Sequence, residues 1–584
     1  MSEIKVAQSV YHLLQETSTS NSSSVAVRFC VDGKWQSLTF GEFNRQVHQV
    51  ADALIQRGVT PGERVAILSK TRVEWSLTDF GILAAGACTV PIYHSSIAKD
   101  VAYILNDANV KTVFVEDEEQ LEKVQSIKDQ VSSLEHCIRL DTWQDFFKTE
   151  PNLKRIRERT DHIKENDLAS IVYTSGTTGE PKGVMLTHDN LLYEALAIEK
   201  LGLLSKKDVQ LLFLPLAHVF AKVMQIAWVK TGHVLVFAES MEKVVDNMKE
   251  TKPTMMAAVP RVYEKVYAKV VGNATSASGI KGFIARWALG QQKQAAKQEK
   301  KGRRPTGFKW FLAQRLVMSK IETKLKETFG GHLRFFISGG APLSPDITYF
   351  FKHAGITILE GYGLTETTAA SCVNVPSSNH IGTVGKPVPG TELQFAEDGE
   401  VLIHGRGVFK GYWNRPEATK EVLTSDGWFH TGDIGVLTPA GFLRITDRKK
   451  DLIVNAGGKK IAPQKIENLI KSRSALISQV VVHGDERPYL TALLVLDEAM
   501  VKDFAKKKNL KKSYAELTKD SLVHRRVDVI MKSVNQGLPS YERIKKWAIL
   551  DHDFVIGDQL TPTLKVKRHL CEKKYRSILD QLYG

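Results

Sequence analysis

Short apolar runs alternate along most of this chain with longer amphipathic segments, and this alternation limits its fold more than any other feature. Examples of the short runs are Arg64–Leu68, Thr112–Val115, Val209–Leu214 and Leu333–Ile337. Apolar stretches of this length favour buried strands, and helical periodicity between them favours helices that cover a sheet. The pattern therefore predicts an α/β fold.

The pattern of glycines and apolar runs changes near residue 382, and this change divides the chain. From Gly382 to Thr446, glycines separate short strand-like runs, which favours a small antiparallel or β-barrel-like unit. The charged turn Asp447–Asp451 follows, after which helix and strand signals resume. We predict a large N-terminal domain over residues 1–447, made of α/β subdomains plus the barrel-like unit. A smaller, mobile α+β domain is expected over residues 448–584, with a hinge near 447–451.

The composition excludes several other classes of protein. Of the 584 residues, 43% are hydrophobic and 25% are charged, as in a globular protein with a large core. The five cysteines are scattered without Cys-x-x-Cys pairs, so neither structural zinc nor a disulfide framework is expected. No apolar run approaches the ~20 residues of a spanning helix, and no signal core is evident, so we expect a cytoplasmic protein. The net charge of +15 suits anionic partners.

The segment Tyr173–Gly183 concentrates glycine, hydroxyl side chains and one lysine directly after the apolar run Ala169–Val172. Glycines at a strand end allow positive φ angles and bring backbone N–H groups close to an anion, while hydroxyls and lysine add donors and charge. The spacing is not that of a P-loop ATPase, and on composition alone a flexible linker is the alternative. The predicted phosphate contacts are Thr174, Ser175, Gly176, Thr177, Thr178, Gly179 and Lys182.

Three further motifs place small and polar residues at turns. Ser338–Pro342 and Glu360–Glu366 each follow a strand-like run, and Thr431–Asp433 lies in the glycine-rich region. Each motif alone has a plain structural interpretation as a glycine turn, a helix cap or an Asx-turn.

Together, these motifs resemble the signatures of the adenylate-forming superfamily, which includes acyl-CoA synthetases, luciferases and peptide-synthetase adenylation domains. The resemblance spans nearly the whole chain, with Tyr-Thr-Ser-Gly-Thr-Thr-Gly-x-Pro-Lys-Gly, Tyr-Gly-x-Thr-Glu, Thr-Gly-Asp and the basic hinge turn in the family's order. The stretches Phe213–Lys222 and Ser338–Leu343 look most like bacterial long-chain fatty acid:CoA ligases.

The resemblance implies roles in nucleotide binding. Tyr362 would flank adenine, Asp433 would accept hydrogen bonds from the ribose hydroxyls, and Arg448 would add a ribose or phosphate contact. Thr365 would contact the α-phosphate, and Glu366 would hold Mg²⁺, a hard cation suited to oxygen ligands. Small residues that let the nucleotide approach the backbone complete this set: Gly339, Gly340, Ala341, Gly361 and Gly363.

The resemblance also implies residues for the chemistry and for the second substrate. Lys565 would be the catalytic cation, although the family pattern places glycine where this chain has Leu564, and Lys567 is a rival. His218 would stand as a gate between the nucleotide and acyl sites, with a structural histidine as the alternative. The backbone at Gly457 and Gly458 would pass the pantetheine arm of coenzyme A, unless it forms only a hairpin turn.

The implied reaction has two steps. A long-chain fatty carboxylate attacks MgATP to give acyl-adenylate and pyrophosphate, and the thiol of coenzyme A then takes the acyl group and releases AMP. One alternative is a fatty acyl-AMP ligase that delivers the acyl group to a carrier protein. Another is a non-catalytic nucleotide- or nucleic-acid-binding protein, but a nucleic-acid partner is not expected because the charge is dispersed. Acyl chain length and oligomeric state stay open.

Residues 281–304 depart from the α/β pattern. This segment carries eight Lys or Arg residues against one acid, Glu299, with Phe283 and Trp287 close by. A solvated surface insertion is the interpretation we favour, because charge runs usually face water. The alternative is a peripheral contact with the inner face of a membrane.

Overall fold

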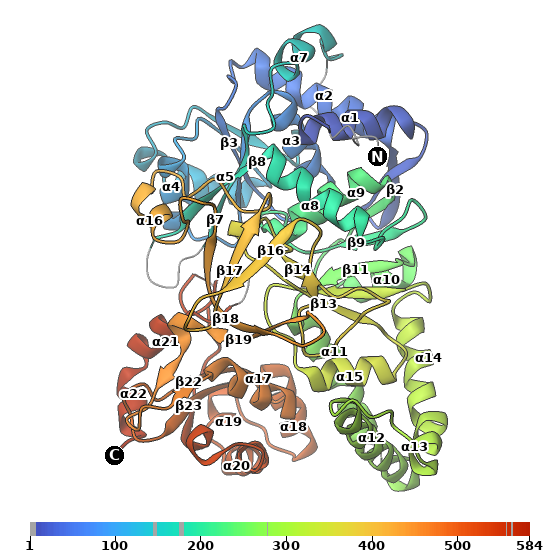
Figure 1. The fold of residues 1–584 in the computed structure, drawn as a ribbon, viewed down its shortest axis with the longest axis vertical. Coiled ribbons are helices and arrows are strands. Elements are labelled where there is room, and N and C mark those ends of the chain that lie inside the picture. Colours follow the sequence, from blue (N-terminus) through green and yellow to red (C-terminus); the bar gives the residue numbers. More distant parts are fainter. Residues whose placement is uncertain (1–6, 144–148, 175–179, 277, 556, 562–564) are drawn as a thin grey trace.

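The computed structural model describes residues 7–143, 149–174, 180–276, 278–555, 557–561 and 565–584. Figure 1 shows a large N-terminal part and a smaller C-terminal part, coloured orange to red, at one end of the molecule. Sheets with helices packed on them build both parts, which confirms the predicted α/β class with a large first and a small second unit.

A six-stranded sheet carries the loop predicted to bind phosphate. Its order is β6-β5-β3-β4-β7-β8, parallel except for the antiparallel pair β7 and β8. Two of the runs predicted as buried strands, Arg64–Leu68 and Thr112–Val115, are strands in the structure, and both are almost wholly buried. The strands are β3 (Arg64–Leu68), β4 (Cys88–Ile92), β5 (Thr112–Val115), β6 (His136–Arg139), β7 (Leu168–Thr174) and β8 (Lys182–Thr187). Helices near it are α2 (Phe40–Gln56), α3 (Val73–Ala84), α4 (Ala98–Asp107), α5 (Glu118–Gln125) and α7 (Leu153–Thr160).

The second large sheet of the N-terminal part has nine strands in the order β15-β14-β13-β12-β11-β9-β10-β1-β2. Its central strands run parallel, so their carboxyl ends meet at one edge. The strands are β1 (Val25–Val31), β2 (Lys34–Thr39), β9 (Val209–Leu212), β10 (Val234–Phe237), β11 (Met255–Ala258), β12 (Phe335–Ser338), β13 (Ile358–Tyr362), β14 (Cys372–Val373) and β15 (Lys386–Pro387). Its helices include α1 (Val10–Ser20), α8 (His188–Lys200), α9 (Val219–Thr231), α10 (Val244–Thr251), α11 (Pro260–Ser276) and α15 (Pro345–His353).

A buried ion pair joins the helices between these two sheets. Lys222 on α9 lies 2.6 Å from Asp79 on α3, and both side chains are almost fully buried. Gln225 and Thr89 also donate hydrogen bonds to the Asp79 carboxylate. Because both oxygens of the Asp79 carboxylate are paired, this group fixes α9, whose first turn borders the candidate site.

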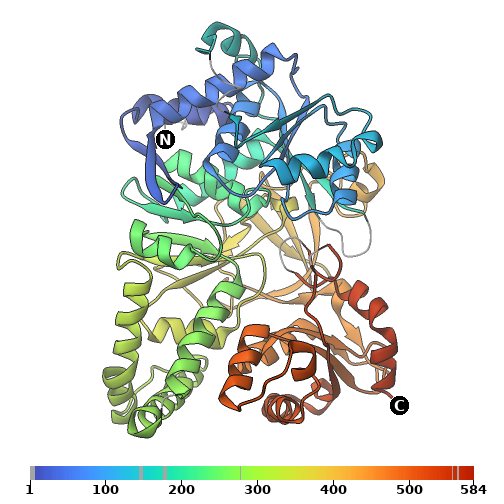
Figure 2. The same cartoon turned by 180° about the vertical axis from the view of Figure 1, so that it is seen from behind.

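The basic segment predicted at 281–304 is mostly helical and lies at the end of the molecule opposite α7 (Figures 1 and 2). It belongs to an arm of α12 (Gly279–Glu299), α13 (Phe308–Ala313), the π-helical turn η2 (Gln314–Met318) and α14 (Ser319–Thr328). Half-buried and buried residues along α12, such as Gln292 and Ala296, face the protein. Within the described residues, no helix combines the length and apolar character needed to cross a bilayer.

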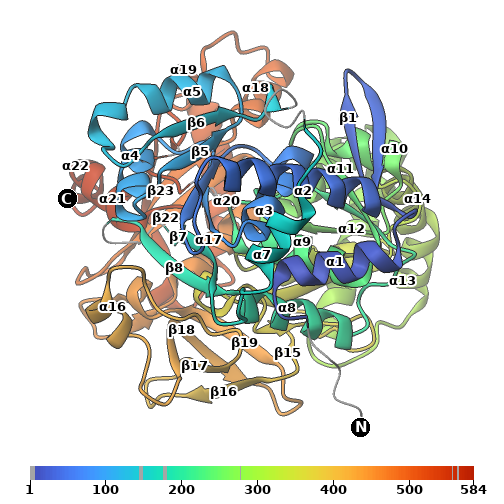
Figure 3. The same cartoon turned by 90° about the horizontal axis from the view of Figure 1, so that it is seen from above.

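The glycine-rich region folds as a four-stranded antiparallel sheet, in agreement with the predicted small antiparallel unit. Figure 3 shows this sheet beside the two larger ones. Its strands are β16 (Thr391–Phe395), β17 (Glu400–Gly405), β18 (Phe429–Leu437) and β19 (Leu443–Arg448), with α16 (Pro416–Lys420) between β17 and β18.

The C-terminal part begins at the 3-10 turn η4 (Lys449–Asp451) and has hydrophobic clusters of its own on both faces of a three-stranded sheet. The three-stranded sheet consists of β22 (Ile477–His483), β23 (Leu490–Leu496) and β24 (Ile544–Ile549), and a separate pair consists of β20 (Ile453–Val454) and β21 (Lys460–Ile461). Its helices are α17 (Pro463–Arg473), α18 (Glu498–Lys507), α19 (Tyr514–Leu517), α20 (Ser521–Asn535), α21 (Arg568–Lys574) and α22 (Arg576–Gln581).

Candidate active site

The two ends of the predicted phosphate loop lie side by side. Thr174 ends β7 and pairs with Lys182 at the start of the antiparallel strand β8. Tyr173 anchors the first end, since its hydroxyl donates to Asp107 at 2.6 Å. Five predicted contacts lie outside the described residues: Ser175, Gly176, Thr177, Thr178 and Gly179.

Tyr412 connects the loop to the second motif, and sequence reasoning missed it. Its hydroxyl donates to a carboxylate oxygen of Glu366 at 2.8 Å. The ammonium of Lys182 lies 4.9 Å from the centre of its ring. The backbone of Tyr412 also bridges to Val184 on β8. Glu366, Lys182 and Tyr412 are distant in the sequence, and only tertiary contacts bring them together. The one signal in the sequence near Tyr412 was the preceding glycine, Gly411, which has a positive φ angle.

The turn that carries Thr365 and Glu366 is tightly constrained. It is a 3-10 turn directly after β13, and the N–H of Phe409 donates to the Glu366 carbonyl at 2.8 Å. A side chain at Gly363 could not fit, because its Cβ would lie 1.4 Å from the carbonyl oxygen of Ala369. Thr368 and Ala369 both adopt positive φ angles, 55° and 87°. Such strain in residues other than glycine is characteristic of functional sites.

The turn after β12 faces the start of α9. Gly339 approaches the ring of Phe220 so closely that a Cβ would lie 3.2 Å from it, and Gly340 has a φ of +83°. His218 caps α9 by accepting from the N–H of Phe220 at 3.1 Å. Burial, helped by the nearby charge of Lys565, lowers the pKa of His218 to about 3. Ala341, the next residue of the turn after β12, is exposed.

Three predicted ribose and adenine residues meet in one hydrogen-bonded group. Tyr362 at the end of β13 donates to Asp433 on β18 at 2.7 Å. The guanidinium of Arg448, at the end of β19, donates to the other oxygen of Asp433 at 2.9 Å. Asp433 is almost fully buried, and each of its two carboxylate oxygens has a hydrogen-bond partner, as is usual for a buried polar group. Burial and the adjacent Asp433 charge raise the pKa of Tyr362 well above its usual value.

Lys565 brings a charge from the C-terminal part to this group. Desolvation and then repulsion by Arg448 lower the pKa of Lys565 to about 8, while Asp433 and Glu366 act in the opposite direction. The residue is solvent-exposed, and its charged neighbours all belong to the N-terminal part. The rival Lys567 points elsewhere, since its ammonium donates to the carbonyl of Gly557 at 3.4 Å.

The predicted path for a pantetheine arm lies apart from these residues. Gly457 and Gly458 form an exposed turn between β20 and β21, in which the side chain of Asn455 accepts from the N–H of Gly457. In this arrangement the turn contacts Arg487 of the C-terminal part. The hairpin alternative therefore describes its local structure.

The donor set around Glu366 fits Mg²⁺. Magnesium is commonly held by one or two carboxylates together with phosphate oxygens of a substrate, instead of by a complete cage of side chains. Among the described residues, no group of three or more His, Cys, Asp or Glu side chains could hold a metal ion. The half-buried Glu366 carboxylate, beside Lys182 and Tyr412, would be one such ligand.

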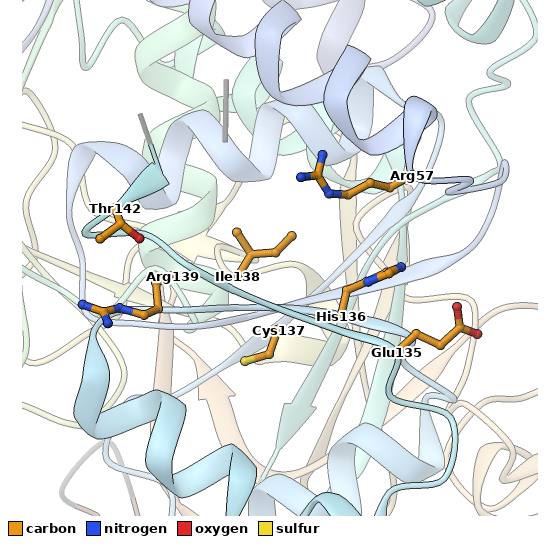
Figure 4. A pocket seen from close by; sticks show the side chains of 7 residues that line it. All are labelled: Arg57, Glu135, His136, Cys137, Ile138, Arg139 and Thr142. Carbon is orange, nitrogen blue, oxygen red and sulfur yellow. The ribbon is translucent and has the colours of Figure 1, made fainter. Parts of the chain in front are cut away.

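A cavity of about 550 Å³ opens on the edge strand β6, lined by residues 135–139 with Arg57 and Thr142 (Figure 4). None of the candidate residues that the structure describes lines this cavity. The chemistry proposed below therefore does not involve it.

Comparison with known proteins places this chain among CoA ligases in sequence and in fold. The chain is 37% identical over 573 residues to the long-chain-fatty-acid–CoA ligase FadD15 of Mycobacterium bovis, covering 95% of this chain and 93% of that protein. Among solved structures, the anthranilate CoA ligase AuaEII in complex with anthranoyl-AMP has a TM-score of 0.73 at 21% identity and covers 99% of this chain and 98% of the other. The o-succinylbenzoate CoA synthetase of Bacillus subtilis, in complex with ATP and magnesium ion, gives a TM-score of 0.68 at 21% identity, with 95% and 98% covered.

These structural likenesses show the same fold, and the family itself is identified from sequence. The family described as AMP-binding enzyme matches residues 14–413, and the AMP-binding enzyme C-terminal domain matches residues 450–584. The motif Thr431–Asp433 and the first part of the hinge turn, including Arg448, lie between the two matches. The chain is a member of the AMP-binding enzyme family.

Proposed function

We propose that this protein is an AMP-forming ligase that activates a long-chain fatty acid with ATP and transfers it to coenzyme A. One observation carries the proposal: Lys565 of the C-terminal part lies within electrostatic reach of Glu366, Asp433 and Arg448 of the N-terminal part. The substrate class is inferred from the 37% identity to a long-chain-fatty-acid–CoA ligase over 95% of the chain.

The first half-reaction needs charge stabilisation more than a nucleophile from the protein. A fatty carboxylate oxygen attacks the α-phosphorus of ATP, a new C–O–P linkage forms, and the bond to pyrophosphate breaks. Negative charge builds on the α-phosphate oxygens, where a fixed cation is most effective. We assign that cation to Lys565, the α-phosphate contact to Thr365, and the grip on pyrophosphate to Lys182, Thr174 and residues 175–179.

The nucleoside is held by the buried group around Asp433. In this assignment the two ribose hydroxyls donate to Asp433, whose present partners are Tyr362 and Arg448. Tyr362 flanks the adenine, and the close backbone at Gly339, Gly340, Gly361 and Gly363 leaves room for the flat base and the phosphates. Mg²⁺, held by Glu366, supplies neutralisation of phosphate charge when bound.

We assign Tyr412 as a positioning residue. Its hydroxyl orients the Glu366 carboxylate, and its ring keeps the ammonium of Lys182 on the phosphate side of the hairpin. A hydrogen bond to a charged group contributes about 1.5–3 kcal/mol, which is enough to select one carboxylate orientation.

The second half-reaction requires a different arrangement of the two parts. The coenzyme A thiol attacks the acyl carbon of the adenylate, the C–S bond forms, and AMP leaves. We place the domain boundary and hinge at 447–451, and propose that rotation there withdraws Lys565 and brings the turn at Gly457 and Gly458 toward the adenylate. The separate hydrophobic clusters of the C-terminal part support motion as a unit.

His218 completes the acyl side of the site. Because its pKa is lowered to about 3, the ring is neutral at pH 7 and suits a wall between the adenylate and an apolar tunnel better than a proton donor. We further propose that the basic segment 281–304 belongs to a surface that brings the protein to lipid.

The decisive experiment measures pyrophosphate release with fatty acids of graded chain length, with and without coenzyme A. We expect ATP- and Mg²⁺-dependent release that increases with chain length, together with consumption of free coenzyme A thiol. Release of pyrophosphate without thiol consumption, and with accumulated acyl-adenylate, would instead establish a ligase that serves a carrier protein. Absence of release with every acid would refute the proposal.

A further inference from the structure

Glu194 on α8 is a buried carboxyl group that the proposed reaction does not use. The residue is 1% exposed. Burial raises the pKa of Glu194 well above its usual value, and among the described residues only a hydrogen bond from the N–H of Ala370 acts in the opposite direction. A buried charge is costly unless a cation or several donors compensate it, so such groups usually take the neutral form. The contacts of Glu194 therefore indicate what it does.

The backbone that Glu194 contacts directly follows the 3-10 turn after β13, which carries the predicted α-phosphate and Mg²⁺ contacts. Ala370 donates its N–H to Glu194 Oε2 at 3.3 Å. The two residues before it, Thr368 and Ala369, have φ angles of 55° and 87°. Left-handed backbone is an outlier for a β-branched residue such as threonine, and it persists only where surrounding contacts enforce it. The hydrogen bond to Glu194 is one of these contacts.

A second set of contacts from α8 supports the same turn through a neighbouring loop. The side chain of Asn190, four residues before Glu194 on the helix, donates to two carbonyls of the loop 406–408, at 2.7 and 3.1 Å. In this loop the carbonyl of Gly407 accepts from the Thr368 hydroxyl at 2.7 Å. Helix α8 therefore contacts the turn directly through Glu194 and indirectly through the loop.

The surroundings of Glu194 favour the neutral acid over the carboxylate. A Cβ added at Gly407 would lie 3.1 Å from Glu194 Oε1 and 3.2 Å from the carbonyl oxygen of Thr367, so these two oxygens border the same small space. A carboxylate is repelled by a carbonyl oxygen, whereas a protonated carboxyl group has a hydrogen to donate. The guanidinium of Arg406, the cation of the neighbouring loop, pairs with Asp189 at the start of α8.

We propose that Glu194 is a positioning residue that acts as a neutral carboxylic acid and holds the turn of Thr365 and Glu366 in its strained form. Helix α8 begins directly after β8, the strand that starts at Lys182. The helix therefore links the element proposed to bind pyrophosphate to the turn proposed to bind the α-phosphate and Mg²⁺. The effect on the reaction rests on the proposed function, whereas the anchoring of the turn does not.

The test compares two substitutions of Glu194 in the full chain. Glu194→Gln keeps the size, the neutral form and an acceptor for the Ala370 N–H. We therefore expect hydrogen–deuterium exchange over residues 364–371 and pyrophosphate release within about twofold of the unaltered chain. Glu194→Leu leaves that N–H without an acceptor. We expect exchange about tenfold faster, release about tenfold slower, and a higher Mg²⁺ concentration for half-maximal release, because Glu366 is no longer held in place.

Glu199→Leu is the matched control, because Glu199 lies on the same helix and pairs with Lys230 on α9 at 3.3 Å. It is expected to leave the exchange over residues 364–371 and the release of pyrophosphate unchanged. Circular dichroism establishes that each variant is folded.

Equal impairment in Glu194→Gln and Glu194→Leu would overturn the assignment of a neutral acid. Unchanged exchange in Glu194→Leu, faster exchange with an unaltered rate and Mg²⁺ dependence, or an equal effect of Glu199→Leu would each overturn the positioning role. If the unaltered chain released no pyrophosphate with any acid, the proposed function would fail, and the exchange data would still decide whether Glu194 anchors the turn.

Discussion

At the scale of single residues, Tyr412 is the contact on which two separate motifs depend. It touches the carboxylate of Glu366 through its hydroxyl and the ammonium of Lys182 through its ring. The negative Glu366 carboxylate is proposed to hold Mg²⁺, whereas the positive Lys182 ammonium is proposed to hold phosphate. The hydroxyl and the ring can therefore be tested separately.

Tyr412→Phe removes the hydroxyl and retains the ring. We expect the Mg²⁺ concentration for half-maximal pyrophosphate release to rise, and the maximal rate to fall about tenfold, because Glu366 loses a charge-assisted hydrogen bond. A Mg²⁺ titration of the initial rate measures both quantities. Tyr514→Phe is the control, since that hydroxyl donates to the Leu496 carbonyl within the C-terminal part. An unchanged Mg²⁺ dependence in Tyr412→Phe would contradict the positioning role.

At the scale of elements, the loop before Lys565 is shaped by a close approach between the two parts of the chain. Gly557 has a φ of +88°, and a Cβ there would lie 2.9 Å from the Cγ2 of Ile97. Ile97 immediately precedes α4 in the N-terminal part, and Gly557 accepts from Lys567 through its carbonyl. This glycine therefore allows the loop that carries Lys565 to reach the site.

Gly557→Ala is expected to slow pyrophosphate release about tenfold, because strain of about 1–3 kcal/mol and the contact with Ile97 both oppose the docked loop. The double variant Gly557→Ala/Ile97→Ala removes the contact and should recover part of the rate. Gly537→Ala serves as control, since its nearest neighbour would be 3.6 Å away. Failure of the second substitution to restore any activity would assign the whole effect to backbone strain and contradict the role of the contact.

Elements with strong local signals were predictable from the sequence. Arg64–Leu68 and Thr112–Val115 are strands because apolar side chains fill them and both faces are covered. The contact of Tyr412 with Glu366 was not predictable, because it depends on tertiary pairing of residues 46 positions apart. The outward aromatic side chains of α13 were also missed. Charge drew attention to 281–304, whereas only packing against α15 reveals which side of each helix stays exposed.

The motifs of the candidate site were predictable to different extents. Motif order identified the residues around Asp433, and the structure brings Tyr362, Asp433 and Arg448 into one hydrogen-bonded group. Their proposed roles toward a nucleotide stay predictions. The sequence could not separate Lys565 from Lys567, because the two lysines are only two residues apart. In the structure Lys565 lies near Glu366, Asp433 and Arg448 and Lys567 donates to the Gly557 carbonyl, while the catalytic role of Lys565 stays a prediction.

At the scale of the whole molecule, the candidate site is divided between two units that each have a hydrophobic core. The N-terminal part supplies Glu366, Asp433 and Arg448, and the C-terminal part supplies Lys565. Between them, Arg261 on α11 lies 3.5 Å from Asp497, which caps α18. The proposed hinge therefore lies in the sequence between the residues proposed to bind the nucleotide and Lys565, which is assigned to the first half-reaction.

Lys565→Ala is expected to lower the rate of adenylate formation by a factor of about 10²–10³, the loss seen when a single preorganised charge-stabilising group is removed. Thioester formation from supplied acyl-adenylate should stay within about twofold, because Lys565 is withdrawn in that step. Single-turnover assays of each half-reaction provide the measurement. Lys567→Ala is the matched control and should retain most of the first half-reaction; equal loss of both steps in Lys565→Ala would refute the assignment.

The contact between the two units has a consequence for how this protein can evolve. In the proposed cycle, every attraction that holds Lys565 in place is released once in each turnover and formed again in the next. The 3.5 Å ion pair between Arg261 and Asp497 and the close but side-chain-free approach at Gly557 suit such repeated release. Substitutions that strengthen the contact between the two units would raise resistance to heat while holding the protein in the arrangement proposed for the first half-reaction. At this boundary, greater thermal stability would come with slower turnover, so weak contacts between the two units favour catalysis.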